Sequence, residues 1–210
     1  MRLTDHLDVT DHLLATTPAV RRKLDLDRPV PDDVLLECLR LAVQAPTPGA
    51  AQAWRWLVVR DQERRAAIGA LFRRVGEAYL EARAATAAPR ALASGRHLVD
   101  VIDRVPVFVI PCLLGRPPEG NAAQSVFYGG IFPAVWSFQL ALRARGLGST
   151  LTSYHLEHER EAAQILGIPE DVTQVGLLPV AYATVADFRP PPRQPVEELS
   201  YLDEWGAPLS

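Results

Sequence analysis

The sequence contains few of the residues on which disulfide scaffolds and nucleic-acid-binding proteins depend. Only two of its 210 residues are cysteines, Cys38 and Cys112, and both lie far apart within apolar patterns. We interpret them as small buried hydrophobic residues in a reducing compartment. The net charge of −3 and the pI near 6.0 leave no basic excess that could neutralise phosphates over an extended footprint. These values argue against nucleic acid or a membrane surface as the partner.

Long apolar runs are also missing. The longest run, residues 129–142, is shorter than the ~20 residues that a membrane-spanning helix needs, so a buried core helix is expected there. The N-terminal stretch carries Asp5, Asp8 and Asp11 and has no apolar segment typical of a signal peptide. The sequence therefore predicts a soluble, cytoplasmic protein.

Several familiar catalytic and nucleotide-binding motifs are absent. GLGSTL at 146–151 has Leu151 where the third glycine of a dinucleotide-binding fingerprint would stand, and it follows a helical pattern. The chain has no P-loop and no GxSxG nucleophile elbow. His155 and His158 could form a metal pair, but no cluster of cysteines or carboxylates supports them, so we predict no metal site.

The patterns that are present alternate between helices and a few strands, which indicates an α/β or α+β class. Strands are expected at 54–60, 105–114 and 173–184. Helices are expected over 5–16, 33–45, 61–85, 93–103 and 127–145, with Gly146 ending the last. The small-residue segment 85–95 is predicted to be a mobile connection, and the loop 115–125 is a candidate for substrate gating. No domain boundary is evident, so one domain over 1–210 is expected.

One chemical feature remains, which is a set of arginines suited to an anion. Arg21 and Arg22 are adjacent, and Arg193 lies in the proline-rich segment PPPRQP. The planar guanidinium matches phosphate oxygens, and a fixed loop would hold it in place. Solvated surface charges explain the same pattern, and spacing alone leaves both interpretations open.

Five segments, taken together and in this order, resemble the FMN-dependent nitroreductase family: TTPAVRRKLDLDRPVP, APTPGAAQAWRWLVVRD, FPAVWSFQLALRARGLGSTLTSYH, LGIPEDVTQVGLLPVAY and FRPPPRQPVEELSYLDEW. The resemblance covers nearly the whole chain. It implies an α+β fold with a central mixed sheet flanked by helices. It also implies an intertwined homodimer in which the extended C-terminal tail, about 187–210, wraps the partner subunit and both chains hold each FMN.

The resemblance implies an FMN-dependent oxidoreductase that takes electrons from NAD(P)H. Nitroaromatic compounds, quinones and similar conjugated acceptors would then enter the same pocket, which predicts ping-pong kinetics. Because the flavin performs the chemistry, we name no catalytic side chain. Two alternatives stay open: a flavin-binding or storage protein, and a family member specialised as an oxidase or dehydrogenase of one metabolite.

The resemblance also assigns roles to residues of this chain. Arg21 and Arg22 match the family's N-terminal arginine motif, which binds the flavin phosphate, and Arg193 matches a C-terminal basic residue that joins it. The loop after the long helix passes the reactive edge of the flavin. Its residues here are Leu151, Thr152 and Ser153.

A second loop is implied to reach the flavin of the partner subunit. Thr47 and Gln52 match the family's pattern there, but the loop asparagine is replaced by Ala50. A family arginine before the Ala-Val-Arg stretch is replaced by Pro18. Losing one such polar contact typically costs ~0.5–1.5 kcal/mol, which would weaken FMN binding about tenfold at most.

Aromatic residues invite a flavin-stacking interpretation that the spacing does not favour. Phe132 and Trp136 lie at helical spacing on an apolar helix, and Trp56 lies in a strand. Such residues are expected to be core or dimer-interface residues, and not flavin contacts.

Overall fold

The computed structural model describes residues 3–209 and divides the chain into two compact units. One unit is Ala19–Ala186, and the other joins the N-terminal segment up to Pro18 to the C-terminal segment from Asp187. The expectation of one domain over 1–210 stays a prediction.

The larger unit is built on one five-stranded sheet. Its strands are β1 (Trp54–Val59), β2 (Val107–Leu114), β3 (Leu147–Ser149), β4 (Val172–Gln174) and β5 (Leu178–Tyr182). They follow the order β1-β2-β5-β3, and β4 also pairs with β2. Aromatic and β-branched residues dominate β1 and β2, as the sequence predicted for both.

The prediction of a mixed sheet was wrong, because all four strand pairings are antiparallel. Two helices, α3 (Gln62–Ala82) and α4 (Pro89–Val101), separate β1 from β2. One connecting helix carries the chain back to the edge of the sheet where the first strand began, so the next strand runs parallel. Two connecting helices return the chain to the edge where the first strand ended, so the next strand runs antiparallel. The segment 85–95 was likewise mispredicted as a mobile connection, since α4 begins within it at Pro89.

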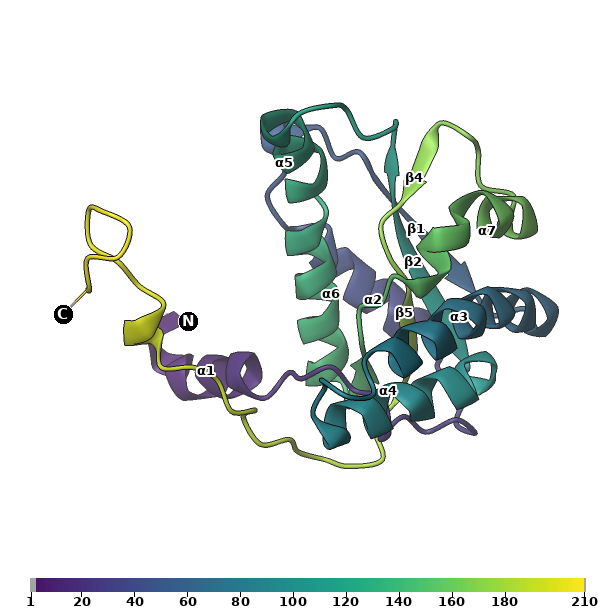
Figure 1. Ribbon diagram of the computed structural model, residues 1–210, viewed down its shortest axis with the longest axis horizontal. Coiled ribbons are helices and arrows are strands. Elements are labelled where there is room, and N and C mark those ends of the chain that lie inside the picture. The colour runs from purple at the N-terminus through teal and green to yellow at the C-terminus, as the bar shows by residue number, and fades with distance from the viewer. Residues whose placement is uncertain (1–2, 210) are drawn as a thin grey trace. The chain divides into compact units, whose positions relative to one another are not determined.

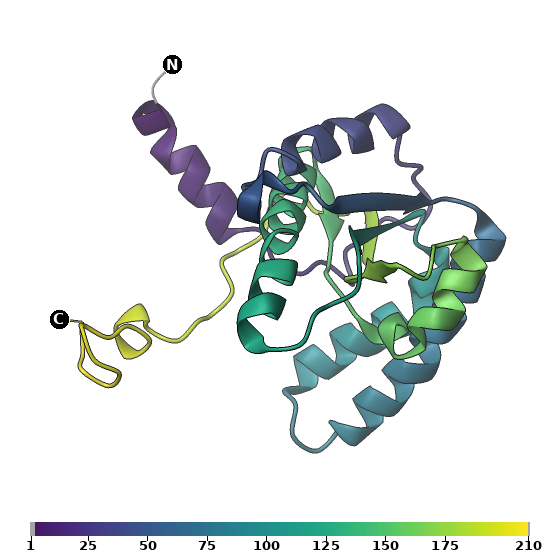
Figure 2. The same ribbon diagram turned by 90° about the horizontal axis from the view of Figure 1, so that it is seen from above.

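Helices cover both faces of the sheet (Figures 1 and 2). On one face lie α2 (Asp32–Ala42) and α6 (Phe132–Ala144), and on the other lie α3, α4 and α7 (Glu159–Leu166). The core between the sheet and the first pair of helices includes Leu35, Val109 and Phe138. Asp61 caps α3, because its Oδ1 accepts a hydrogen bond of 2.9 Å from the Arg64 N–H.

The long apolar helix predicted over 127–145 is two helices. α5 (Asn121–Gly129) ends at a glycine pair, and α6 begins at Phe132. Gly146 follows α6 with φ of +74°, a left-handed conformation that ends the helix as predicted. The segment Asn121–Ala144 has the length and composition of a membrane span, but α6 buries Val135, Phe138 and Leu142 and is a core helix.

Short 3-10 helices complete the larger unit. They are η2 (Pro48–Ala50), η3 (Ile102–Arg104) and η4 (Tyr154–His158). η4 leads directly into α7, which ends at Gly167, where φ is +67°. η2 lies in the loop that carries Thr47 and Gln52, and η4 follows the loop 151–153.

The smaller unit consists of η1 (Leu3–His6), α1 (Leu7–Ala15) and the tail with η5 (Val196–Glu198). His12 Nε2 lies 3.3 Å from Asp187 Oδ1, so α1 contacts the start of the C-terminal segment within this unit. The tail exposes large apolar side chains, and Trp205 is 92% exposed. That a partner subunit covers them stays a prediction.

Candidate functional site

The arginine segment is held against the end of β3. The Val20 N–H donates a hydrogen bond of 2.8 Å to the Ser149 carbonyl. Gly148 makes this close approach possible, because a Cβ at that position would lie 2.9 Å from the Val20 side chain. Arg21 and Arg22 therefore lie beside the strand from which the loop 151–153 emerges.

The loop 151–153 is fixed to the neighbouring chain segment. Thr152 and Leu177 exchange backbone hydrogen bonds of 3.0 and 2.8 Å. Leu151 lies over Gly176, where an added Cβ would come within 2.6 Å of Leu151 Cδ1. Leu151 and Ser153 are exposed, Thr152 is half-buried, Arg22 is exposed and Arg21 is half-buried. The structure thus brings five of the eight predicted flavin residues to β3 and the loop that follows it: Arg21, Arg22, Leu151, Thr152 and Ser153.

Gly176→Ala is expected to displace this loop. The new methyl group would collide with Leu151 Cδ1 and would stand 3.2 Å from the Thr152 carbonyl oxygen. Overpacking of this kind typically costs ~1–3 kcal/mol. Thermal unfolding should report that loss, and FMN affinity should fall with it. Gly129→Ala is the control, because nothing lies within 4 Å of a Cβ added there. A Gly176→Ala protein with unchanged stability and FMN affinity would contradict the packing described.

Tyr154 follows the loop directly and was missed by the sequence analysis. Its ring packs against Phe72 and Tyr79 of α3, with centroid separations of 4.9 and 5.3 Å. Burial and Tyr79 raise the pKa of the Tyr154 hydroxyl, whereas Arg21 and Arg83 oppose the rise. Both arginines therefore lie within electrostatic reach of this hydroxyl. No motif in the sequence marks Tyr154, since its partners come from a helix about 80 residues earlier.

The two histidines considered as a metal pair have other roles. His155 is fully buried, and burial lowers its pKa to about 4, so its imidazole is neutral at pH 7. His158 accepts a 3.0 Å hydrogen bond from Arg74 Nε. Glu159 binds Arg116 through 2.8 and 2.9 Å hydrogen bonds, which hold its carboxyl pKa below the usual value. These contacts fasten η4 and α7 behind the loop 151–153.

Thr47 and Gln52 lie in a different part of the larger unit. The loop that carries them packs at the junction of α5 and α6, where Pro48 Cδ would be 3.1 Å from a Cβ added to Gly130. The Gln52 N–H makes a long hydrogen bond of 3.4 Å to Thr47 Oγ1. Gly49, Ala50 and Gln52 all have positive φ, which makes the loop a tight arch. No hydrogen bond, ion pair or ring contact within Ala19–Ala186 joins this loop to Arg21 or to 151–153.

Arg193 belongs to the smaller unit. It is exposed, and its Nη1 donates a 3.2 Å hydrogen bond to the Pro192 carbonyl. Its predicted contact with the flavin phosphate stays a prediction.

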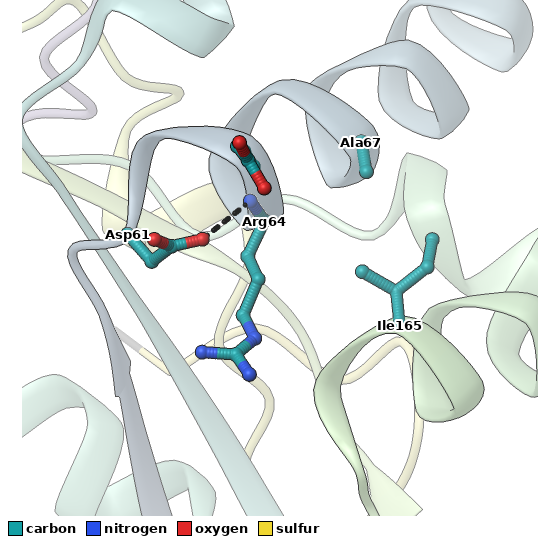
Figure 3. Close-up of a pocket in the computed structure, with 5 residues that line it drawn as sticks. Asp61, Arg64, Ala67 and Ile165 are labelled. Atoms are coloured by element: carbon teal, nitrogen blue, oxygen red, sulfur yellow. Dashed lines mark hydrogen bonds between the residues drawn. The ribbon is translucent and has the colours of Figure 1, made fainter.

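Two cavities of the larger unit are lined by other residues than the eight predicted flavin residues. One of about 360 Å³ lies between the start of α3 and the end of α7, and Figure 3 shows Arg64 pointing away from Ala67 and Ile165 there. The other, of about 480 Å³, is lined by residues of α3 and α4, among them Glu77, Glu81 and Arg96. The predicted flavin residues of the larger unit therefore lie outside both cavities.

Comparisons with known proteins agree with this fold. The NADH dehydrogenase of Thermus thermophilus is 30% identical over 186 residues, which cover 81% of this chain and 85% of that protein. A nitroreductase-like family protein from Bacillus cereus superposes with a TM-score of 0.68 at 20% identity, covering 93% of this chain and 96% of that chain. Iodotyrosine deiodinase bound to FMN and 3-iodo-L-tyrosine superposes at 0.66 with 19% identity, covering 96% and 98%.

The fold and these relatives define an oxidoreductase of the α+β class, with helices on both faces of a central sheet. The family model described as the nitroreductase family matches residues 19–182. The chain belongs to the nitroreductase family.

Proposed function

We propose that the protein is an FMN-dependent oxidoreductase that uses NAD(P)H to reduce nitroaromatic, quinone or similar conjugated acceptors. Family membership supports this proposal, as does the name NADH dehydrogenase borne by the Thermus relative. The single observation that carries it is the position of Arg21. This half-buried cation follows Val20, which is hydrogen-bonded to Ser149 just before the loop 151–153, and it has no ion-pair partner among residues 19–186.

The residues of this region fit FMN. An unpaired, half-buried guanidinium suits a phosphate or another anionic group. Thr150, the residue before the loop, has a buried Oγ1 without a hydrogen-bond partner among the described residues. Gln139 Nε2 and Ser149 Oγ, joined by a 3.2 Å hydrogen bond, provide further polar groups at the same strand end. FMN carries phosphate, hydroxyl and ring carbonyl groups that could form hydrogen bonds with these polar groups.

When bound, FMN supplies the hydride chemistry between NAD(P)H and the acceptor. The residues of the chain then bind and orient. Arg21 and Arg22 would hold negative charge of the cofactor, with Arg193 joining them. Leu151, Thr152 and Ser153 would line the reactive edge, where the hydrogen bonds between Thr152 and Leu177 keep the loop in place. No side chain is assigned a proton-transfer step.

We further propose that a second copy of the chain completes the site. The arginine half lies at the end of β3, and the Thr47–Gln52 half lies at the junction of α5 and α6. On α6, Phe132 and Trp136 are 42% and 41% exposed, which leaves an apolar strip available to a partner. In a homodimer, the loop of one subunit would meet the arginines of the other. A tail wrapped around the partner would cover Trp205.

The colour of the purified protein tests the function. We expect yellow protein that bleaches with NADH or NADPH and regains colour with a quinone or nitroaromatic compound. Steady-state rates should give parallel double-reciprocal lines. Yellow protein that does not bleach would instead support a storage protein. Bleaching by one particular metabolite, with the colour restored by oxygen, would favour a specialised oxidase. Colourless protein that never takes up FMN would refute the proposal.

Ala50→Asn is expected to tighten FMN binding. Ala50 has φ of +52°, which costs most L-residues ~1–2 kcal/mol, and asparagine tolerates this region better. The amide would also restore the side-chain donor that Ala50 lacks. We expect about 2- to 10-fold tighter binding, from one hydrogen bond of ~0.5–1.5 kcal/mol. Fluorescence titration with FMN measures it.

Ala51→Asn is the matched control for this variant. Ala51 is the next residue, is also exposed and has φ of −67°, so asparagine brings no relief of backbone strain. Equal effects of the two substitutions on FMN affinity would show that the conformation at Ala50 is not what matters.

A further inference from the structure

The cavity of about 480 Å³ between α3 and α4 lies outside the residues that are proposed to hold the flavin. Its volume is within the range of about 300–1,000 Å³ that small-molecule sites occupy in proteins. Two apolar residues, Leu80 and Val99, belong to its lining. Charged residues from both helices also line it, and these are Glu77, Glu81, Arg96 and Asp100. The proposed function uses none of these side chains.

The apolar part of the cavity is fixed by two close contacts between the helices. Leu80 of α3 packs over Gly95 of α4, where an added Cβ would come within 2.9 Å of Leu80 Cδ2. Val99 of α4 packs over Gly76 of α3, where an added Cβ would come within 2.7 Å of Val99 Cγ2. Leu80 and Val99 are 6% and 1% exposed. A short aliphatic chain in the cavity would bury apolar surface against these two side chains.

The charges around this apolar part are unbalanced. Three carboxylates and one guanidinium give the lining a formal net charge of −2. Among the described residues 3–209, none of the four groups takes part in an ion pair. Glu77 and Glu81 lie one turn apart on α3, and like charges at this spacing repel each other. All four side chains are exposed, so a cationic ligand can reach them from solvent.

The carboxylates are also distributed in a way that does not suit a single metal ion. Among the described residues, no group of three or more His, Cys, Asp or Glu side chains is arranged to hold a metal. Glu77 and Glu81 come from α3, whereas Asp100 comes from α4. A ligand that matches them therefore carries its positive charge at more than one place.

We propose that the cavity between α3 and α4 binds an organic dication in which a short aliphatic chain joins two ammonium groups. The chain would lie against Leu80 and Val99. One ammonium group would approach Glu77 and Glu81, and the other would approach Asp100. This site is separate from the proposed function and does not rest on it, because no predicted flavin residue lines the cavity.

Cadaverine, a diamine with a five-carbon chain, is the probe for this site. Isothermal titration calorimetry at low salt measures its Kd, together with the Kd of pentylamine and of Mg²⁺. Pentylamine has the same chain with one ammonium group, and Mg²⁺ has both charges without a chain. We expect cadaverine to bind about two- to fivefold more tightly than pentylamine, which is the gain from one more exposed ion pair. Binding of Mg²⁺ as tight as that of cadaverine would overturn the proposal, because charge alone would then suffice.

Two substitutions in the lining should change the affinity in opposite directions. Glu81→Gln removes one carboxylate and should weaken cadaverine binding about two- to fivefold. Arg96→Ala removes the guanidinium of the lining and should strengthen cadaverine binding by a similar factor. The matched controls are Glu63→Gln and Arg64→Ala. Both change exposed residues at the other end of α3, at the cavity of Figure 3, and should leave the Kd unchanged.

The proposal is overturned if cadaverine shows no saturable binding. It is equally overturned if each control changes the Kd as much as its partner in the lining, because the net charge of the protein would then explain the effect. Thermal unfolding of every variant verifies that the fold is kept. None of these measurements involves FMN, so a negative result here leaves the proposed function intact, and a protein without flavin leaves this proposal intact.

Discussion

Arg21→Ala is expected to yield protein that loses its flavin on gel filtration. Arg21 is the half-buried cation of the arginine segment, and the hydrogen bond from Val20 to Ser149 holds it beside the loop 151–153. A hydrogen bond to a charged group is worth ~1.5–3 kcal/mol, which corresponds to a loss of FMN affinity of about 10- to 150-fold. Absorbance near the flavin maximum, compared with protein absorbance across the elution peak, gives the occupancy.

Arg40→Ala is the appropriate control for Arg21→Ala. Arg40 is an exposed arginine of α2 whose side chain makes no ion pair or hydrogen bond among residues 19–186, so its removal should leave FMN occupancy unchanged. Full flavin retention by Arg21→Ala would refute the assignment of Arg21. Equal losses in both variants would point to a general effect of charge and not to a specific contact.

A mixed dimer is expected to regain flavin that neither parent variant binds well. One parent carries Arg21→Ala, and the other carries Thr47→Ala together with Gln52→Ala. If each site takes its arginine from one subunit and its loop from the other, the heterodimer contains one site with both defects and one site with none. Co-expression with two affinity tags isolates this heterodimer. Its flavin content should approach half of that of the unmodified protein.

This expectation rests on the different contacts that the loop and the arginine segment make within one chain. Thr47 packs near Gly130, whereas Arg21 and Thr152 lie at the strand end near Ser149 and Leu177. A site formed within one chain would leave both sites of the heterodimer defective, and the flavin content would equal the mean of the two variant homodimers. A chain that remains monomeric at all concentrations would equally contradict the shared site.

Local patterns in the sequence predicted most of the elements correctly. The strands at Trp54 and Val107 and the glycine stop at Gly146 depend on neighbours in sequence, and the structure confirms them. The single helix expected over 127–145 was wrong, because the adjacent Gly129 and Gly130 separate α5 from α6. The mixed sheet, which the family resemblance implied, was wrong, because all four strand pairings are antiparallel.

The amino-acid sequence by itself determined the family, through ordered segments that run from the arginine pair to the proline-rich tail. It also determined which residue types could hold an anion, because guanidinium groups next to a fixed loop suit that task wherever they lie. It marked Ala50 and Pro18 as departures from the family's pattern.

Only the tertiary structure decided which of these residues share a place. It set the arginine segment against β3 through Val20 and Ser149, and it put Thr47 and Gln52 at the junction of α5 and α6. It also added Tyr154, whose ring contacts with Phe72 and Tyr79 span about 80 residues of sequence. The physical reason is that packing against a notch such as Gly76, and pairing across strands such as β3 and β5, join residues whose separation no local pattern encodes.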